Sequence, residues 1–529
     1  MRLGRLRRRV AAAVTVPVVM RRSGLLWPGS PSRMVRQLAA LQRWGTSLAG
    51  SFIVAAVRDP DRPAIIDEFG TLTYAEVDAR TTRLATALGA GIAAEDGPPR
   101  VALLCRNHRG MAESLIACGK LGADAVLLNT GLATEQLLII LAEQEIDVLI
   151  ADAEFEPLLV AAPGSIRKLT ADGLDDLLAA TPDEPLLPPE RLGRTIVLSS
   201  ATGRPKGAER PPRPGFGPFA AVASRIPLRA RDTILIEAPL FHSWGYAGLQ
   251  LALALRATIV LNRRYEAQST LAAIERHGCS VVIAVPVMLQ RLLELPAERY
   301  DLTTLRVVAT SGSTLPGGLA TGFMDTFGDV LYNLYGSTEA SWVSIATPED
   351  LWDRPSTAGR PPRGTRLAIL AEDGSPVPPG GQGYIHADNG YYTGGKPREG
   401  RDGLLSLGDI GHLDPQGRLF VEGRGDDMVI SGGENIFPSE VEDVIARLPE
   451  VREVAVLGVT DARFGQRLAA YVVVRAGEHL DGDAVRDCVR QRFARFAVPR
   501  DVHFLDALPR NPTGKVVRPA LLSLAAAGR

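Results

Sequence analysis

Short apolar runs alternate with amphipathic helical segments through much of the chain, and this alternation limits the fold more than any other feature. Residues 73–76 read Thr-Tyr-Ala-Glu, which has the form of a capping box, and Val77, Leu84 and Leu88 share one face of the helix that would follow. Strands that alternate with helices imply right-handed crossovers and a parallel sheet covered on both faces, so we predict an α/β fold. The predicted buried strands are Val101–Cys105, Asp124–Leu128, Asp147–Ile150, Thr233–Ala238, Ala257–Leu261 and Val281–Val285, and helices are expected near Met111–Lys120 and Thr134–Glu143.

The chain changes character twice after this region. At 529 residues it is too long for one core and should divide into domains. Residues 360–422 are rich in Gly and Pro with short apolar runs, which predicts a small β-rich subdomain. The remainder predicts a compact α+β module with one helix capped by Asp483. We therefore predict a basic extension at 1–58, a large domain of two layered α/β sheets with the β-rich subdomain at 59–424, and a smaller α+β domain at 425–529.

The first 58 residues carry eleven arginines and no acidic residue. Within them, Val10–Met20 is an apolar run interrupted by Pro17, and it is shorter than the roughly 20 residues that a membrane-spanning helix needs. The order of charge and apolar residues is like that of a signal peptide, but no small-residue cleavage site follows. Three interpretations stay open: a basic segment on anionic lipid, a disordered tail, or a chain that starts at Met20 or Met34.

The net charge, the histidines and the cysteines argue against some classes of partner and site. A formal net charge of -1 gives no overall attraction to nucleic acid, so we expect no nucleic-acid partner. None of the seven histidines forms an H-x3-H or H-E-x-x-H array, which argues against a structural zinc site. Widely spaced cysteines in apolar stretches predict buried free thiols and a cytoplasmic, reducing compartment. These cysteines are Cys105, Cys118, Cys279 and Cys488.

The first motif that carries chemistry is the segment from Thr195 to Gly207. An apolar strand leads into a loop of hydroxyl residues that ends in Gly, Pro and Lys206. Hydroxyls and free backbone N–H groups can surround phosphate oxygens, and a lysine adds a compact positive charge. Lysine is rare in this chain, since only five of the 59 basic residues are lysines, and Lys206 and Lys515 both lie in Gly/Pro frames. A surface turn is the plain alternative for this segment.

A second motif, Asn333 to Ala340, reads Asn-Leu-Tyr-Gly-Ser-Thr-Glu-Ala and follows an apolar run. It offers an amide for a base edge, an aromatic ring for stacking, and a hydroxyl beside a carboxylate. The last pair suits Mg²⁺, which prefers one or two carboxylates with phosphate oxygens and water. The alternative is a helix N-cap at Ser337 or Thr338.

Two further motifs lie in the last quarter of the chain. Asp409 follows Leu-Gly, and Arg424 stands fifteen residues later beside glycines, so that a carboxylate and a guanidinium can grip a ribose diol. A buried ion pair is the alternative. Residues 509–515, Pro-Arg-Asn-Pro-Thr-Gly-Lys, form a rigid turn that presents Lys515, for which the alternative is an exposed lysine on a tail.

In this order and at these distances, the four motifs resemble the adenylate-forming superfamily of acyl-CoA synthetases, aryl-CoA ligases, luciferases and peptide-synthetase adenylation domains. The resemblance covers roughly residues 60–520. Residues 432–440, Gly-Gly-Glu-Asn-Ile-Phe-Pro-Ser-Glu, look like the fatty- and medium-chain acyl-CoA ligases.

The resemblance implies a role for each matching residue. Lys515 would approach the α-phosphate and the attacking carboxylate, where a positive charge opposes the charge that builds up. Thr338 and Glu339 would serve phosphate and Mg²⁺. Asp426 would be the hinge of a mobile C-terminal domain, whose rotation brings Ser431 and Gly432 to the thiol. The implied ATP site is Ser199, Ser200, Thr202, Gly203 and Lys206 for the phosphates, Gly312, Ser313, Thr314, Asn333, Tyr335 and Gly336 for adenine, and Asp409 and Arg424 for the ribose.

The phosphate loop departs from the family's usual Ser-Gly-Thr-Thr-Gly. Ser200 stands at the glycine position and Ala201 at a hydroxyl position. If the glycine position requires a positive φ, serine costs about 1 kcal/mol or more there. We therefore expect weakened ATP affinity, and the hypothesis fails if Ser200→Gly with Ala201→Thr leaves the ATP dependence of the rate unchanged. Leu407 and Thr314 also depart from the usual residues.

The acid is predicted from the segment that aligns with the acyl pocket, which includes His242, Trp244 and Gly245. Amino-acid-activating relatives carry an aspartate at the His242 position, and His242 offers no fixed negative charge, so an amino-acid substrate is not expected. His242 serves either as a gate or as a packed side chain. An apolar tunnel suits a medium- or long-chain fatty acid, converted with ATP to acyl-AMP and pyrophosphate and then to acyl-CoA. The alternatives are an acyl-AMP ligase that loads a carrier protein and a non-catalytic nucleotide- or lipid-binding relative.

Overall fold

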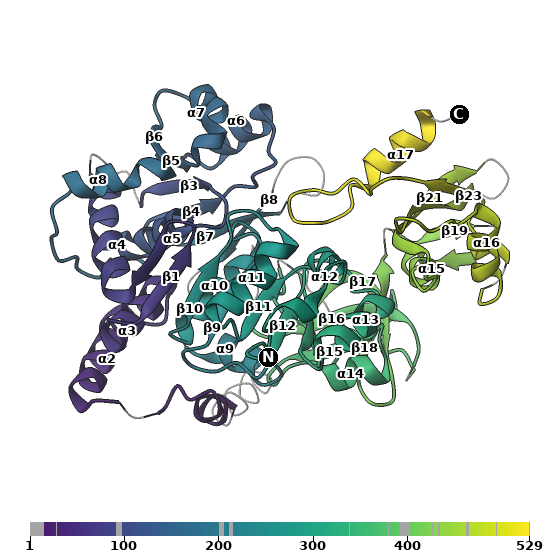
Figure 1. Ribbon diagram of the computed structural model, residues 1–529, viewed down its shortest axis with the longest axis horizontal. Helices are drawn as coiled ribbons and strands as arrows, with labels where there is room; N and C mark the ends of the chain where they lie inside the picture. The colour runs from purple at the N-terminus through teal and green to yellow at the C-terminus, as the bar shows by residue number, and fades with distance from the viewer. Residues whose placement is uncertain are drawn as a thin grey trace.

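The chain forms a large N-terminal body built on two sheets, a small antiparallel sheet beside it, and a separate C-terminal lobe (Figure 1). The computed structural model describes residues 15–27, 29–90, 98–199, 206–210, 215–337, 339–378, 380–391, 403–425, 427–431, 434–461, 465–493 and 495–527. The predicted α/β fold with a smaller α+β lobe is confirmed.

The first sheet of the body has six strands in the order β6-β5-β3-β4-β7-β8. The five strands from β6 to β7 are parallel, and β8 adds antiparallel to β7. Apart from Arg100 and Asp124 at their first positions, the central strands β3, β4 and β5 are buried and apolar, because helices cover both faces of the sheet. The strands are β3 (Arg100–Leu104), β4 (Asp124–Leu127), β5 (Val148–Ala151), β6 (Arg167–Thr170), β7 (Thr195–Ser199) and β8 (Lys206–Arg210), and the helices between them are α5 (Arg109–Leu121), α6 (Thr134–Glu143), α7 (Glu156–Ala161) and α8 (Leu174–Ala180).

The second sheet has eight strands in the order β14-β13-β12-β11-β9-β10-β1-β2, parallel except for β2 and β14 at its edges. Its strands are β1 (Pro63–Asp67), β2 (Gly70–Thr73), β9 (Thr233–Ile236), β10 (Thr258–Leu261), β11 (Val281–Ala284), β12 (Val307–Thr310), β13 (Leu331–Tyr335) and β14 (Ser344–Ala346). The helices that accompany it are α4 (Tyr74–Gly89), α9 (Gly217–Ala223), α10 (Ser243–Ala254), α11 (Ala267–His277), α12 (Pro286–Leu292), α13 (Gly317–Phe327) and α14 (Pro348–Asp353).

Helix α4 begins where the sequence predicts. The backbone N–H of Glu76 donates to Thr73 Oγ1 at 3.2 Å, and the N–H of Thr73 donates to Glu76 Oε2 at 2.7 Å, which completes the capping box. Val77, Leu84 and Leu88 are fully buried in the core that the two sheets share with their helices. The capping box and the apolar face are both confirmed.

The predicted β-rich subdomain is a four-stranded antiparallel sheet in the order β15-β16-β17-β18. Its register places Asp409 directly opposite Arg424 on neighbouring strands, which fixes two of the predicted site residues side by side. The strands are β15 (Arg366–Leu370), β16 (Gly383–Asp388), β17 (Leu405–Leu413) and β18 (Leu419–Arg424).

The C-terminal lobe has two apolar cores of its own, one on each face of its sheet. Helix α16 is capped by Asp481, whose Oδ1 accepts from the Ala484 N–H at 2.8 Å. The predicted cap at Asp483 is therefore wrong, because Asp483 already lies within the first turn. The elements are β19 (Val429–Ser431), β20 (Glu434–Ile436), α15 (Pro438–Ile445), β21 (Val451–Asp461), β22 (Gly465–Val474), α16 (Gly482–Arg490), β23 (Asp501–Phe504) and α17 (Arg518–Ala527).

Residues 15–22 are helical, and helices α2 and α3 follow them in the chain ahead of β1. Helix α3 (Leu48–Arg58) packs into the main core, where the Phe52 ring stacks on Tyr74 at 5.7 Å. Helix α2 (Pro31–Trp44) has no buried residue and lies against α3 at the lower left edge of the molecule (Figure 1). The division at residues 58 and 424 stays a prediction. No helix among the described residues combines the length and hydropathy needed to cross a bilayer.

The four cysteines are free. Three are buried as predicted, and Cys488 is half-buried on α16.

Candidate active site

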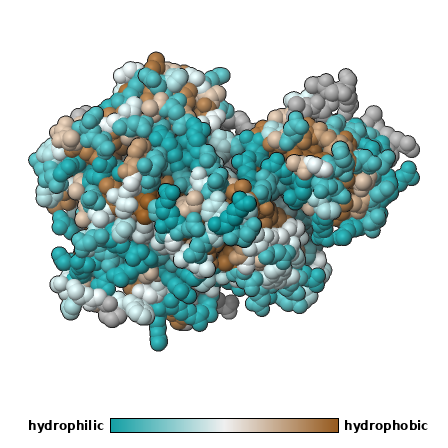
Figure 2. Space-filling model, in the orientation of Figure 1, coloured by the Kyte–Doolittle hydropathy of each residue, from teal (hydrophilic) through white to brown (hydrophobic). Residues whose placement is uncertain are grey.

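One pocket of about 1870 Å³ lies between the N-terminal body and the C-terminal lobe and extends into the body. Figure 2 shows the molecule indented at the top between these two parts. The pocket brings together most of the described residues that the sequence predicts for the site. Those that line it are His242, Trp244, Gly312, Ser313, Thr314, Asn333, Tyr335, Gly336, Asp409, Arg424 and Lys515.

The two loops that follow β12 and β13 form one wall of the pocket. These strands are parallel neighbours, so their carboxyl ends meet at the same edge of the sheet, where open α/β sheets bind ligands. Gly312 has a φ of +97°, a conformation that favours glycine. A Cβ on Gly336 would lie 1.9 Å from the carbonyl oxygen of Ser341, so no side chain fits there. Asn333, on β13, is buried and lines the pocket beside these loops.

Asp409 and Arg424 face the pocket from adjacent strands, and Tyr335 reaches them from the sheet. The Tyr335 hydroxyl donates a hydrogen bond to Asp409 Oδ2. Burial, followed by the nearby Asp409 carboxylate, raises the pKa of Tyr335 well above its ordinary value, so the phenol stays a donor. The result is a carboxylate held in place beside a guanidinium, which is the donor and acceptor set that a ribose diol needs.

Lys515 enters the pocket from the C-terminal lobe on a tight turn. Asn511 Oδ1 accepts from the backbone N–H groups of Thr513 at 3.0 Å and Lys515 at 2.9 Å, and Gly514 has a φ of +82°. Burial and the Arg424 guanidinium lower the pKa of Lys515, while the Asp409 and Glu339 carboxylates oppose this shift. The ammonium therefore lies within electrostatic reach of the predicted ribose pair and of the predicted metal ligand.

Polar contacts seat the C-terminal lobe in this position. Arg452 of β21 forms a bidentate ion pair with Glu294 of the body, with N···O distances of 2.6 and 2.9 Å. Gln290 donates to the Arg452 carbonyl. Within the lobe, Arg510 binds Glu453 at 2.6 Å, which anchors the start of the Lys515 turn. No sequence motif marks Gln290, Glu294 or Arg452 as part of the site.

The pocket continues into the body as an arm along one face of α10. His242 caps this helix, since its Nδ1 accepts from the Trp244 N–H at 3.4 Å, and Trp244 Nε1 donates to the Ala284 carbonyl at 3.0 Å. Gly245 does not line the arm; a Cβ there would lie 2.2 Å from the carbonyl oxygen of Pro239, so this glycine serves packing. The arm is lined by Leu127, Thr195, Val197, Phe219, Val222, Tyr246, Ala247, Leu251 and Ala254, and it reaches Thr46, Ser47 and Leu48.

Comparison with known proteins identifies the architecture that carries this pocket. Residues 52–394 match the AMP-binding enzyme family and residues 440–515 match the AMP-binding enzyme C-terminal domain. The chain belongs to the AMP-binding enzyme family. Membership confirms the predicted adenylate-forming acid–thiol ligase class, with ATP, Mg²⁺ and coenzyme A as its cofactors and co-substrates.

Three relatives of the family show how broad the match is. A feruloyl-CoA synthase of Amycolatopsis sp is 34% identical, over 89% of this chain and 97% of the relative. A long-chain-fatty-acid–CoA ligase of Mycobacterium tuberculosis is 31% identical, over 85% and 92%. The structure of o-succinylbenzoate CoA synthetase from Bacillus subtilis with its acyl-adenylate superimposes with a TM-score of 0.76 at 29% identity, over 89% and 97%. The fatty acid is not confirmed, because relatives named for aromatic acids match at least as well.

Several predicted residues lie where side chains are not described. Ser199 and Lys206 are described in backbone alone, as the register pair that ends β7 and begins β8, and Ser431 ends β19. Two residues of the second motif are described. Glu339 is exposed. Ser337 Oγ accepts a hydrogen bond from the Ala340 N–H at 3.0 Å, in a turn rather than at the start of a helix. The remaining residues, Ser200, Ala201, Thr202, Gly203, Thr338, Asp426 and Gly432, lie outside the described residues, and the roles of all the site residues stay predictions.

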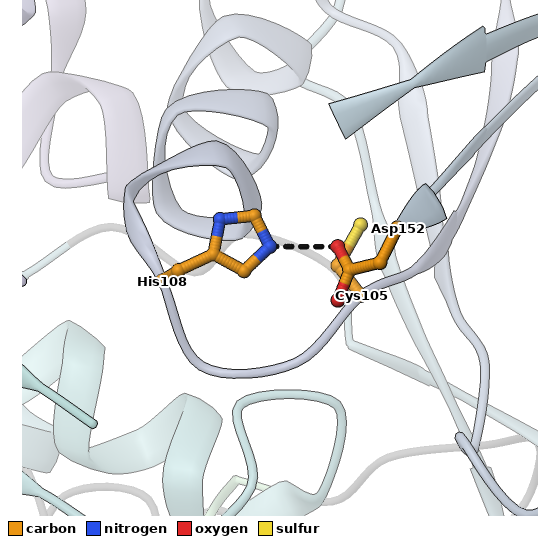
Figure 3. Close-up of side chains that lie close together, drawn as sticks. All are labelled: Cys105, His108 and Asp152. Carbon is orange, nitrogen blue, oxygen red and sulfur yellow. Dashed lines mark hydrogen bonds and ion pairs between the residues drawn. The ribbon is translucent and has the colours of Figure 1, made fainter. Parts of the chain in front are cut away.

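A second cluster of chemical groups lies away from the pocket, at the ends of β3 and β5. Cys105, His108 and Asp152 place their polar atoms within 4.8 Å of one another (Figure 3). His108 Nδ1 accepts from the Gly110 N–H at 3.1 Å, so Nε2 carries the hydrogen and donates to Asp152 Oδ1 at 2.7 Å. Burial, followed by the Asp152 carboxylate, raises the pKa of the Cys105 thiol well above its ordinary value. Because both ring nitrogens of His108 are hydrogen-bonded within the fold, we assign the His108–Asp152 pair a structural role.

Proposed function

We propose that this chain activates a carboxylic acid with an extended apolar body, with a medium- or long-chain fatty acid as the leading candidate. The acid reacts with ATP to give acyl-AMP and pyrophosphate, and the acyl group then passes to the thiol of coenzyme A. One observation carries the proposal: a single pocket joins Lys515, Asp409, Arg424 and Tyr335 to an apolar arm.

The charges at the place where the arm meets the wall formed by the loops after β12 and β13 suit the first half-reaction, which is the formation of acyl-AMP. Lys515 enters there from the lobe, and a fixed cation opposes the negative charge that develops as a carboxylate attacks a phosphate. Asp409 and Arg424 hold the sugar, and the Tyr335 hydroxyl keeps the Asp409 carboxylate oriented. Removal of one such charge-stabilising donor costs about a hundredfold or more in rate.

The arm supports an apolar acid. Its described lining residues include no carboxylate, so nothing there pairs the ammonium group of an amino acid. Helix α10 has 12 residues, which gives the arm a wall of about 18 Å at 1.5 Å per residue. A single-ring acid would fill only part of that length, whereas an extended chain would use it. An aryl acid is the second candidate, favoured by the similarity to feruloyl-CoA synthase.

Pyrophosphate exchange with a panel of acids tests the proposal. We expect exchange with fatty acids to rise with chain length and to exceed exchange with cinnamate-type acids; the reverse order would favour the aryl candidate. Thioester formation after addition of coenzyme A shows that coenzyme A, rather than a carrier protein, accepts the acyl group. Absence of exchange with any acid, in protein shown to be folded, would leave a non-catalytic binder.

Lys515→Ala provides the sharper test of the catalytic role. We expect exchange to fall by about a hundredfold or more while thioester formation from supplied acyl-AMP is retained. Lys168→Ala is the matched control, because Lys168 lies on β6, donates to the Ala162 carbonyl and is not among the residues that line the pocket. Equal loss of both half-reactions in Lys515→Ala would contradict the assignment.

A further inference from the structure

The described part of the N-terminal segment exposes an unusual amount of apolar surface. Trp27 is 73% exposed, and Val35 and Leu38 on α2 are 67% and 63% exposed. Val35, Leu38 and the exposed Met34 lie on neighbouring positions of the helix and form one outward stripe. No residue of α2 is buried, and the α2 residues that pack against the core are Ala40 and Trp44, so core packing does not account for the exposed stripe.

The same segment carries one sign of charge. Residues 1–58 contain eleven arginines and no acidic residue, in a chain whose formal net charge is -1. Arg33 pairs with Asp61 at 3.1 Å. Arg36 and Arg43 are both exposed and lie together on one side of the apolar stripe, and neither has an ion-pair partner among the described residues. Unpaired positive charge thus lies beside an exposed apolar stripe on the same helix.

We propose that helix α2, together with Trp27 before it, binds the surface of an anionic lipid bilayer. A helix with arginines beside an exposed stripe of large apolar residues has the two components that interfacial binding needs: charge attraction to anionic headgroups and burial of apolar side chains at the acyl boundary. Nucleic acid would satisfy the arginines but would leave Val35 and Leu38 in water. The bilayer is therefore the occupant that uses both features.

The placement has a consequence for the pocket. Residues Thr46, Ser47 and Leu48 follow α2 after one glycine and line the pocket, as does exposed Gln250 on α10. Bilayer binding through α2 therefore brings this part of the pocket lining toward the lipid. An apolar acid can then reach the arm from the membrane. This step rests on the proposed function, whereas the binding of α2 to the bilayer surface does not.

Co-sedimentation of the full-length protein with vesicles tests the proposal. We compare vesicles of phosphatidylglycerol and phosphatidylcholine in equal parts with vesicles of phosphatidylcholine alone. We expect binding to the anionic vesicles only, weakened by added salt. Val35→Asp with Leu38→Asp should lower the partition coefficient by about tenfold or more, and Arg36→Glu with Arg43→Glu should do the same.

The matched control is Val160→Asp with Leu187→Asp, which changes two side chains that are 73% and 74% exposed elsewhere on the body. It should bind vesicles as the unchanged protein does. Equal binding to neutral vesicles, unchanged binding of the Val35 and Leu38 variant, or binding to duplex DNA without binding to vesicles would each overturn the proposal. Pyrophosphate exchange in the absence of lipid reports separately on acid activation, so the two proposals can fail independently.

Discussion

At the scale of single residues, the hydrogen bond from Tyr335 to Asp409 connects the sheet of the body to the β-rich subdomain. The bond fixes a carboxylate that would otherwise turn freely at the rim of a large pocket. A hydrogen bond to a charged group contributes about 1.5–3 kcal/mol, which corresponds to at least a tenfold change in an equilibrium constant.

We therefore expect Tyr335→Phe to raise the KM for ATP by roughly tenfold and to change kcat much less, because the bond orients a binding group rather than a reacting one. The dependence of pyrophosphate exchange on ATP concentration measures both constants. Tyr332→Phe is the control, since Tyr332 lies on the same strand but outside the pocket lining. A fall in kcat with an unchanged KM would contradict this interpretation.

The sequence showed some of these residues and not others for a physical reason. Asp409, Arg424 and Lys515 stand in Gly/Pro-framed motifs, and such frames mark places where the backbone must take one conformation. Arg452 and Glu294 lie 158 residues apart in exposed positions of ordinary composition, and only the folded chain brings them together. The local sequence around Arg452 or Glu294 does not predict the contact between them.

At the scale of elements, α10 determines what enters the arm. Trp244 and Ala247 are one turn apart on the face that lines it, and Ala247 is small enough to leave the arm open. The sequence predicted the start of this wall from the segment before α10. It did not predict the rest, because α10 is apolar on nearly every side and helical periodicity does not separate the pocket face from the core face.

We expect Ala247→Phe to reduce kcat/KM for long acids by about tenfold or more and to leave short acids such as propionate nearly unaffected, since an added ring would fill the middle of the arm. Ala247→Ser is the matched control of similar volume. Exchange rates across a series of chain lengths give the comparison. Equal losses at every length would show that the helix was damaged rather than the arm shortened.

Helix α15 carries carboxylates that respond to pH. Burial, followed by the neighbouring Glu422 carboxylate, raises the pKa of Glu440 from 4.5 to about 7. Glu422 also binds His412 Nδ1 at 2.6 Å, and burial raises the pKa of Asp443 on the same helix to about 6. Because the folded-state pKa of Glu440 lies above its unfolded value, the stability that its protonated carboxyl group contributes is fully present below about pH 4.5. This contribution is lost as pH rises through about 7.

We therefore expect the amides of α15 to lose protection against hydrogen exchange, after correction for the intrinsic rate, as pH rises through this window. Glu440→Gln removes the titrating group and should flatten the dependence. Glu478→Gln, which changes a residue in the loop between β22 and α16, should leave it intact. A steep dependence that persists in Glu440→Gln would assign the effect to Asp443, or to Glu442 on the same helix, whose pKa burial raises to about 7.

At the scale of the whole molecule, the lobe places the Lys515 ammonium within electrostatic reach of Asp409 and Glu339, the arrangement that we propose for the first half-reaction. A second chemistry in the same pocket needs a different face of the lobe, so rotation near Asp426 follows as a prediction. The contacts that hold the present position should then be strong enough to select it and weak enough to release it. Arg452 and Glu294 fit this description, since both side chains are 35% exposed and such pairs contribute about 1 kcal/mol or less.

Variants that change the charges of the Arg452–Glu294 ion pair, between the lobe and the body, distinguish the two half-reactions. Glu294→Arg places two guanidinium groups together, so we expect adenylation, measured by pyrophosphate exchange, to fall by a few-fold, within the fivefold that about 1 kcal/mol allows. Thioester formation from supplied acyl-AMP should be unchanged or faster, because the lobe leaves its first position more easily. The double variant Glu294→Arg with Arg452→Glu rebuilds the ion pair in reverse and should restore adenylation. If the double variant stays as slow as the single one, or if both half-reactions slow together, the pair does not govern the position of the lobe.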